Sequence, residues 1–375
     1  MQKILHIPNY YKPHVGGIEQ TCHDIVDSLD GVYLQKIICF SEDKQTKCET
    51  IDGVEVVKCG VWKKILSQSI SFSYKKELKR ILFEFKPDFV ILHFPNPFVQ
   101  HYLLKYIKKQ KAKLIVWYHT DIVKQKIVRQ FFKGQTKRLL NKANSIVCTS
   151  PLYSKASATL KNYQHKIEII PSCINEDRLR IDENIKQIAL EIRKNNEGKI
   201  IVFAVGRHVK YKGLTYLVEA SKYLDERYII YIAGNGPLTE SLKSQAQNDF
   251  KIHFLGRVDD AMLKAYYFAM DIYAFPSITK NEAFGLTLAE SMYFEHPAIT
   301  FTIPGSGVNY VNINEVTGLE VENSNAKAFA EAIIKLGNDT SLREKYGRAA
   351  RQRVEENFSL VKFKNNLLSF LQKME

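Results

Sequence analysis

The feature that most constrains the fold is an alternation of short apolar segments with segments of helical periodicity. Ile18, Cys22, Ile25 and Leu29 illustrate the second kind, because their spacing places them on one face of a helix. Such alternation predicts parallel sheets covered by helices on both faces, an α/β fold. The expected strands are residues 3–7, 34–40, 53–57, 88–93, 113–118, 145–149, 167–170, 199–205, 227–233, 252–255, 271–275, 297–301 and 318–321.

The 375 residues are enough for two domains with substantial cores. Residues 181–199 are polar and carry no strand pattern, so we expect a linker there, between an N-terminal domain, residues 1–180, and a C-terminal domain, residues 181–355. Ser359 can cap a final helix, because a serine hydroxyl accepts hydrogen bonds from the free N–H groups at a helix start. We expect that helix within residues 356–375.

The apolar residues form no run of the roughly 18 that a membrane span requires. The opening residues 1–7 are too short and too interrupted for a secretory signal. Six cysteines, at positions 22, 39, 48, 59, 148 and 173, include no C-x-x-C pair and no cluster with zinc spacing. We therefore expect a cytoplasmic protein with reduced thiols and no metal site.

Positive charge is concentrated in the first half of the chain. Residues 1–180 hold 30 Lys and Arg against 16 Asp and Glu, which accounts for the whole net charge of +14. This potential could attract nucleic acid or an anionic membrane, or it could belong to a solvated basic face. A candidate patch for peripheral docking on the inner face of the cytoplasmic membrane comprises Trp62, Lys63, Lys64, Phe72, Lys75, Lys76, Lys79 and Arg80.

The chemically most informative stretch is residues 275–290, FPSITKNEAFGLTLAE. A strand closed by Pro276 delivers Glu282 on a loop, and a turn at Gly285 opens a helix that carries Glu290. The N–H groups and the dipole of a helix start attract negative charge, while carboxylates accept hydrogen bonds from hydroxyl groups. The stretch therefore predicts a site for an anionic ligand that bears hydroxyls.

Other candidate residues also stand at the ends of expected strands, where parallel sheets bind their ligands. A dinucleotide G-x-G-x-x-G fingerprint is absent, which argues against a site for NAD. Three strand ends in the C-terminal half carry glycine, and two of these have an adjacent arginine. The strand ends in question carry Gly16 with Gly17, His93, His119, Gly206 with Arg207, Gly234 with Gly236, and Gly256 with Arg257.

Together these motifs resemble family 4 glycosyltransferases of GT-B architecture, which retain configuration at the anomeric carbon. The resemblance covers nearly the whole chain. Residues 118–123, with Gln125 and Lys126, are also similar to a subset that acts in bacterial surface-polysaccharide assembly, some of them mannosyltransferases. The motifs are Gly16-Gly17-Ile-Glu19, His119-x-Asp121, Gly206-Arg207-x4-Lys212-Gly213, Gly234-x-Gly236-Pro237, Phe254-Leu-Gly256, Glu282-x7-Glu290, Ser306-Gly-Val308 and Thr317-Gly-Leu319.

The resemblance implies two Rossmann-like domains facing across a cleft, with the C-terminal helix returning to the N-terminal domain. It also implies transfer of a sugar, possibly mannose, from a GDP- or UDP-linked donor to a glycan or polyprenyl-linked acceptor. Neither a cofactor nor a metal is implied, because cations and a helix start stabilise the leaving group. Closure of the domains would bring His119 to the donor side and exclude water.

The resemblance further implies a role for each site residue. Arg207 and Lys212 would neutralise the donor diphosphate, since fixed cations stabilise charge that develops on a leaving group. Glu282 would bind the transferred sugar, Glu290 the ribose, and His119 the sugar at the reacting centre. Further donor contacts would be Gly16 and Gly17 at the diphosphate, Val258 at the base, and the backbone of Phe284, Gly285, Leu286 and Thr287; the acceptor side would hold His93, Asn96 and Asp121.

Two segments depart from the family pattern and leave local loop geometry open. Tyr293-Phe294-Glu295 stands where a small residue and a glycine are common, and Ser172-Cys173 replaces an Asn-Gly turn. Two other functions also stay open. A GT-B-shaped sugar-nucleotide epimerase would bind the same diphosphate without an acceptor. A non-enzymatic nucleic-acid binder would explain the basic half but not Glu282 or the glycines at the strand ends, and no nucleic-acid module is visible.

Overall fold

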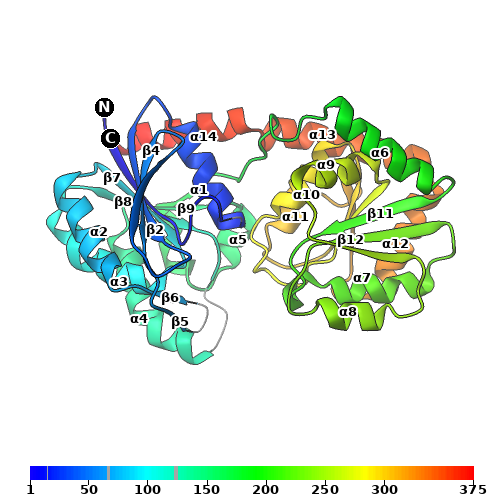
Figure 1. Ribbon diagram of the computed structural model, residues 1–375, viewed down its shortest axis with the longest axis horizontal. Coiled ribbons are helices and arrows are strands. Elements are labelled where there is room, and N and C mark those ends of the chain that lie inside the picture. Colours follow the sequence, from blue (N-terminus) through cyan, green and yellow to red (C-terminus); the bar gives the residue numbers. More distant parts are fainter. Residues whose placement is uncertain (15, 66–67, 122–125) are drawn as a thin grey trace. The chain divides into compact units, whose positions relative to one another are not determined.

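The computed structural model describes residues 1–14, 16–65, 68–121 and 126–375, with the backbone alone at Ile65 and residues 126–131. The chain divides into two compact units (Figure 1). The first comprises Met1–Ser172 together with Phe363–Glu375, and the second comprises Cys173–Lys362. A largely parallel sheet forms the centre of each unit, which confirms the expected pair of Rossmann-like sheets.

In the first unit the described strands run in the order β10-β9-β8-β7-β1-β2-β4-β3. All neighbours are parallel except β3 and β4. The sequence did not predict β3 or the separate β5–β6 hairpin, because these are short or polar segments. The strands are β1 (Lys3–Ile7), β2 (Leu34–Phe40), β3 (Lys47–Ile51), β4 (Val54–Cys59), β5 (Lys63–Ile65), β6 (Gln68–Ile70), β7 (Phe89–Phe94), β8 (Lys113–Tyr118), β9 (Ser145–Cys148) and β10 (Ile167–Ile169).

Helices cover both faces of this sheet, with α2 and α3 on one side and α1 on the other (Figure 1). Their apolar faces are buried, as Cys22, Ile25 and Val26 of α1 show. Burial of such stripes is the main source of helix stability in a folded protein. The helices are α1 (Gly17–Ser28), α2 (Ser73–Glu84), α3 (Pro97–Tyr106), α4 (Lys126–Lys142) and α5 (Pro151–Ala156).

In the second unit the described strands are all parallel and run in the order β13-β12-β11-β14-β15-β16. Every strand was expected from its apolar run. This order places the carboxyl ends of β12, β11 and β14 side by side. The strands are β11 (Ile200–Val205), β12 (Tyr228–Ala233), β13 (Ile252–Gly256), β14 (Ile272–Phe275), β15 (Ala298–Phe301) and β16 (Gly318–Val321).

The expected linker at residues 181–199 was wrong, because most of it forms the helix α6 of the second unit. Asp182 caps the helix through the N–H of Ile185, and Ile185 packs with Ala189 against Ala265 and Ala269 of α9. The helices are α6 (Glu183–Asn195), α7 (Leu214–Ala220), α8 (Thr239–Gln245), α9 (Asp260–Ala269), α10 (Leu286–Tyr293), α11 (Val308–Val311), α12 (Ala326–Asn338) and α13 (Thr340–Asn357).

The chain ends in the helix α14 (Leu360–Met374), most of which belongs to the first unit. Ser359 caps it as expected, since its Oγ accepts a hydrogen bond of 3.3 Å from the N–H of Lys362. The ring of Phe363 lies 6.1 Å from that of Trp117 in β8. Within the described ranges, none of the helices has both the length and the apolar character needed to cross a bilayer.

Candidate functional site

Glycines bring the loops at the carboxyl ends of β11 and β12 into backbone contact. Gly234 has a φ of 108°, and a Cβ there would lie 2.1 Å from the carbonyl oxygen of Gly206. A Cβ at Gly236 would likewise lie 2.6 Å from the carbonyl oxygen of His208. Only glycine permits such close approach, so the glycines predicted at these strand ends have a packing reason to be there.

Gly213 holds the loop after β11 against the end of β14. Its φ is 62°, and a Cβ would lie 2.0 Å from the carbonyl oxygen of Pro276. The N–H of Ile278 donates to the carbonyl oxygen of Tyr211 at 2.9 Å across the same contact. The adjacent Lys212 is thereby carried to the loop that leaves β14.

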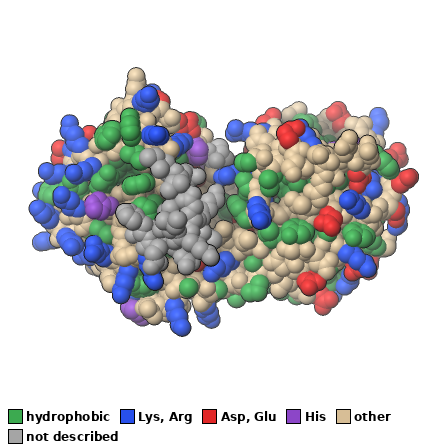
Figure 2. All heavy atoms as spheres, turned by 90° about the horizontal axis from the view of Figure 1, so that it is seen from below, with side chains coloured by type: hydrophobic (Ala, Val, Ile, Leu, Met, Phe, Trp, Pro, Cys, Tyr) green, Lys and Arg blue, Asp and Glu red, His purple; other side chains and the backbone are tan. Residues whose placement is uncertain are grey.

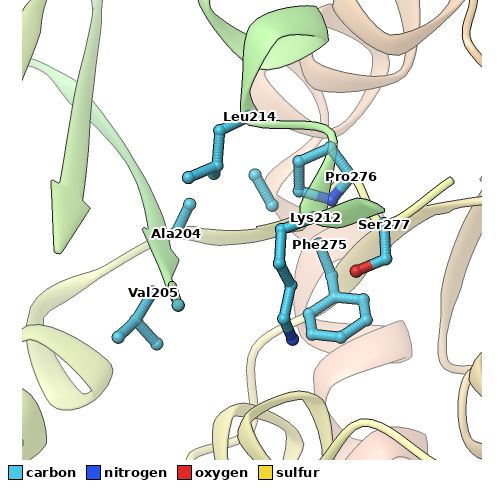
Figure 3. A pocket seen from close by; sticks show the side chains of 9 residues that line it. Ala204, Val205, Lys212, Leu214, Phe275, Pro276 and Ser277 are labelled. Atoms are coloured by element: carbon cyan, nitrogen blue, oxygen red, sulfur yellow. The ribbon is translucent and has the colours of Figure 1, made fainter. Parts of the chain in front are cut away.

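Lys212 forms an ion pair with Glu282 at this point, with 2.5 Å between Nζ and Oε2. Their side chains are 16% and 14% exposed. Figure 3 shows Lys212 running alongside the ring of Phe275, and Nζ lies 5.0 Å from the ring centroid. Lys212 lines a small pocket together with Gly206, Phe275, Pro276 and Ser277. The two residues predicted to bind the diphosphate and the sugar are thus direct partners.

Burial, the largest single influence, would lower the pKa of Lys212, but the charge of Glu282, its hydrogen bond and the charge of Tyr211 together outweigh burial, so the pKa rises above its ordinary value. Lys212 therefore carries its positive charge throughout the physiological range. Arg207 acts in the opposite direction on that pKa, which places its guanidinium close enough for electrostatic coupling. Arg207 is exposed. The loop after β11 therefore carries two cations, Lys212 paired with Glu282 and Arg207 facing solvent.

The loop that carries Glu282 is fixed by the loop after β15. The hydroxyl of Ser306 donates to the carbonyl oxygen of Glu282 at 2.6 Å. A Cβ at Gly307 would lie 1.7 Å from the carbonyl oxygen of Ala283, so glycine is required there. Ser306 and Gly307 belong to a motif for which the sequence indicated no role; the structure shows that they position the loop of Glu282.

The helix α10 starts beside the ring of Phe275. Gly285 precedes it with a φ of 92°, and a Cβ there would lie 3.2 Å from Cζ of Phe275. Leu286 and Thr287 open the helix, where backbone N–H groups have no intrahelical acceptor. The side chain of Phe284 is buried, 5.2 Å from the ring of Phe358. The Phe284 side chain thus packs in the core, which leaves only the backbone of residues 284–287 for the expected contacts with the donor.

Glu290 lies on α10 and already has two partners. One carboxylate oxygen forms an ion pair with Arg178, and the other accepts a hydrogen bond of 3.2 Å from the hydroxyl of Tyr267. Burial raises the pKa of Glu290, although Arg178 and Tyr267 oppose the rise. The sequence offered no signal for Arg178, which precedes Glu290 by 112 positions.

Val258 follows β13 at the neighbouring strand end. The N–H of Gly234 donates to the carbonyl oxygen of Gly256 at 2.6 Å, which joins this loop to the one after β12. Val258 is half-buried, and its side chain packs against the core of the unit. Its backbone thus belongs to the same edge of the sheet as Arg207.

In the first unit, His93 and His119 meet at the ends of the adjacent strands β7 and β8. Nδ1 of His93 lies 3.0 Å from Nε2 of His119, and the rings stack with centroids 5.3 Å apart. Burial lowers the pKa of His119 to about 3. Burial, His119 and His6 together hold the pKa of His93 well below its ordinary value. Both rings are therefore neutral, and one ring donates its N–H to the unprotonated nitrogen of the other.

The remaining acceptor-side candidates are Asn96 and Asp121. Asn96 is buried at the start of α3. Oδ1 of Asp121 accepts hydrogen bonds of 2.7 Å from the hydroxyls of Tyr118 and Ser157, so Asp121 secures the loop after β8. Of the motif at residues 118–126, residues 122–125 lie outside the described part of the chain, as does the side chain of Lys126.

Gly16 and Gly17 stand at the start of α1, as expected. Gly16 is the N-cap residue in an extended conformation, with a φ of −170°. A Cβ at Gly16 would meet Oε2 of Glu19 at 2.3 Å, the flexible end of a side chain. The packing need for glycine is consequently weaker here than at Gly213.

The comparisons with known proteins point to one family. Residues 186–353 match the glycosyl transferases group 1, and residues 15–178 match glycosyltransferase family 4. The chain is 30% identical over 362 residues to the O-antigen chain mannosyltransferase C of Escherichia coli, covering 95% of this chain and 94% of that protein. It is 31% identical over 365 residues to the D-rhamnosyltransferase WbpZ of Pseudomonas aeruginosa, covering 95% and 92%.

The fold has a clear counterpart among solved structures. The Anabaena protein HepE, crystallised in complex with UDP, superposes with a TM-score of 0.78 at 15% identity, over the full length of both chains. This similarity confirms the expected GT-B fold.

Proposed function

We propose that this chain, which belongs to the family 4 glycosyltransferases, transfers a hexose from a nucleotide-diphosphate sugar to a growing or lipid-linked glycan. The observation that carries the proposal is the ion pair of Lys212 and Glu282 beside Arg207 and the start of α10. Cations and free N–H groups bind a diphosphate, and a carboxylate binds the hydroxyls of a polyol. In this chain all of these groups lie at one edge of the sheet of the second unit.

Lys212 and Arg207 are proposed to bind the diphosphate. As the glycosidic bond to the phosphate breaks, negative charge grows on the leaving oxygen, and two fixed cations stabilise that charge. The N–H groups of Leu286 and Thr287 would add donors without adding charge. Gly16 and Gly17, at the start of α1, are proposed to approach the same diphosphate through their backbone.

Glu282 is proposed to exchange partners when the donor binds. In the described structure its carboxylate neutralises Lys212. An incoming diphosphate would take over Lys212, and the carboxylate would then accept hydrogen bonds from the hydroxyls of the transferred sugar. The ion pair thus keeps a partly buried charge compensated while the donor is absent, since an unpaired buried charge is costly.

Glu290 is proposed to accept hydrogen bonds from the ribose, and the backbone of Val258 to contact the base. Arg178 and Tyr267 engage one lone pair on each oxygen of Glu290. A carboxylate has about four acceptor sites, so acceptor capacity remains for hydroxyls.

The transfer is proposed to proceed on one face of the sugar, with retained configuration, as in the family. The bond from the anomeric carbon to the leaving phosphate breaks while a bond to the acceptor oxygen forms, and the acceptor proton passes to that phosphate. His119 is proposed to contact the sugar at the reacting centre, supported by its hydrogen bond to His93. Asn96 and Asp121 remain proposals for the acceptor side.

The sugar and its acceptor are proposed from the relatives. The two named above are an O-antigen mannosyltransferase and a D-rhamnosyltransferase, which favours mannose and a cell-surface polysaccharide. Either GDP or UDP could carry the sugar. These relatives do not favour the alternative of a sugar-nucleotide epimerase, which isomerisation of the donor in an acceptor-free assay would reveal.

A basic surface in the first unit is proposed to dock the enzyme peripherally on an anionic membrane, where a lipid-linked acceptor would lie. On the face drawn in Figure 2, Lys and Arg side chains gather over the part of the chain drawn on the left. Trp62 and Phe72 are 56% and 73% exposed with ring centroids 5.4 Å apart, and Lys63 and Lys64 are exposed beside them. Exposed aromatic rings next to lysines suit the interface of an anionic bilayer.

The experiment that tests the donor assignment is a thermal-shift screen of GDP-, UDP- and ADP-sugars with the purified chain. A ligand at 100 times its dissociation constant stabilises the folded state by about 2.7 kcal/mol, so the correct donor should raise the melting temperature clearly. Absence of any shift with all three nucleotide classes would contradict the proposal.

A further inference from the structure

Three buried side chains with metal-binding chemistry converge beneath the start of α1. A ring nitrogen of His6 in β1, the thiol of Cys22 in α1 and a ring nitrogen of His93 in β7 all lie within 4.8 Å of one another. The sequence predicted no metal site, because these residues are far apart in the chain and have no zinc spacing. The parallel pairing of β1 with β7 brings them together.

The hydrogen bonds of His6 leave one ring nitrogen with a free lone pair. The side-chain N–H of Gln35 donates to the carbonyl oxygen of Val26 at 2.9 Å, so the amide oxygen of Gln35 faces Nε2 of His6, also at 2.9 Å. Nε2 must then carry the proton, and Nδ1 of the neutral ring is an acceptor. Nδ1 is buried and has no hydrogen-bond partner among the described residues.

His93 presents a second such nitrogen. Nδ1 bonds to His119 at 3.0 Å, while Nε2 is buried and lacks a partner in the described part of the chain. When Nδ1 donates to His119, the lone pair resides on Nε2. A histidine that ligates a metal typically donates its other N–H to a fixed acceptor, and Gln35 and His119 are placed to serve His6 and His93 in that way.

We infer that Nδ1 of His6, Sγ of Cys22 and Nε2 of His93 form a binding site for a thiophilic d10 cation, with Zn²⁺ as the reference ion. Imidazole and thiolate ligands suit zinc and copper. Zinc bonds of about 2.0–2.3 Å place ligand atoms roughly 3.5 Å apart, so binding requires the cluster to contract by roughly 1 Å. The thiol proton would be released to solvent as the metal–sulfur bond forms.

The site would tie together β1, α1 and β7. Cys22 lies one turn inside α1, whose first residues carry the Gly16–Gly17 loop. A bound ion would therefore restrain that loop from the buried region beneath the start of α1. This role is structural and does not depend on the proposed glycosyl transfer.

Cobalt titration of the purified, chelator-treated full chain tests the inference. We expect one Co²⁺ per chain, a near-ultraviolet thiolate-to-cobalt charge-transfer band and visible bands of low coordination number, all displaced by Zn²⁺. Cys22→Ala should abolish the charge-transfer band, and His93→Gln should weaken Zn²⁺ affinity by more than about 100-fold. The control Cys48→Ala should change neither, because Cys48 is an exposed thiol on β3.

Circular dichroism establishes that each variant is folded, and the two variants remove different ligands, so the inference does not depend on one of them. Absence of a stoichiometric charge-transfer band in the wild type would overturn it. A band that persists in folded Cys22→Ala but disappears in Cys48→Ala would also overturn it, since the binding thiol would then be the surface one.

Discussion

The ammonium of Lys212 lies 2.5 Å from a carboxylate oxygen of Glu282, although 69 residues separate them in the chain. Gly213 creates this contact by letting the loop after β11 touch the backbone of Pro276. The pair is mostly shielded from water, yet Lys212 lines a pocket. A charge pair so placed can exchange its internal partner for a charged ligand.

The ion pair should contribute to stability as a coupled unit. Lys212→Met leaves the Glu282 carboxylate uncompensated, and Glu282→Gln does the same to the ammonium, so each should destabilise the fold by roughly 2 kcal/mol or more. The double variant should be less destabilised than the sum, because neither charge is then left alone. Urea unfolding of the four proteins measures the coupling, and strict additivity would contradict it.

Gly213→Ala should destabilise the protein more than a left-handed backbone alone explains. Gly213 and Gly31 have similar φ values, 62° and 71°, but only at Gly213 would a Cβ collide with backbone. Gly31→Ala should therefore cost about 1 kcal/mol for the conformation, and Gly213→Ala distinctly more, with loss of donor binding. Equal unfolding free energies for the two variants would refute this role of the glycine.

The stability of Glu290→Gln relative to wild type should depend on pH. Burial raises the pKa of Glu290 despite Arg178 and Tyr267, with Asp260 adding to the rise. The folded wild type thus holds a proton that the unfolded chain has already lost, so this group costs stability as pH rises from about 4.5 through its raised pKa. The glutamine variant lacks that cost, and denaturation from pH 4 to 7 should show the difference moving in its favour. Movement in favour of wild type would count against the assignment.

Reversal of charge at Lys63 and Lys64 should weaken binding to anionic vesicles. Each basic side chain near such a surface contributes about 1 kcal/mol, so the double Glu variant should bind at least about tenfold less, and added salt should weaken the wild type too. Lys222→Glu with Lys345→Glu is the matched control, since both are exposed lysines of the second unit. Vesicle co-sedimentation that is insensitive to salt, or equally reduced by the control, would disprove the docking surface.

The sequence predicted the sheets and most of the strand-end residues, because apolar runs closed by glycine or proline identify parallel strands without further information. His93 and His119 end neighbouring strands, and Phe94 pairs with Tyr118 in register, so their proximity follows from the topology. The ion pair of Lys212 and Glu282 cannot be predicted from the topology. It depends on how two loops pack against each other, and the hydrophobic periodicity of the sequence carries no information about loop packing.

Other misses have local causes. The helix α6 was mistaken for a linker because its polar composition masked the helical spacing of Ile185 and Ala189. These two residues form an apolar face that becomes buried only when α9 packs against it. Arg178 was overlooked because nothing near it in the sequence indicates a partner 112 positions away. Glu295, which stands where the family often has glycine, adopts a φ of 61°, in the left-handed region that favours glycine.

Lys212 is proposed to bind the diphosphate, while Glu282 is proposed to bind the sugar. Calorimetric titration of the nucleoside diphosphate and of the nucleotide sugar against wild type, Lys212→Met and Glu282→Gln separates the two roles. Lys212→Met should weaken both ligands. Glu282→Gln should weaken only the nucleotide sugar and leave the diphosphate bound at least as tightly, because the ammonium is no longer neutralised. Equal weakening of both ligands by Glu282→Gln, or unchanged binding in Lys212→Met, would contradict this division of roles between the two residues.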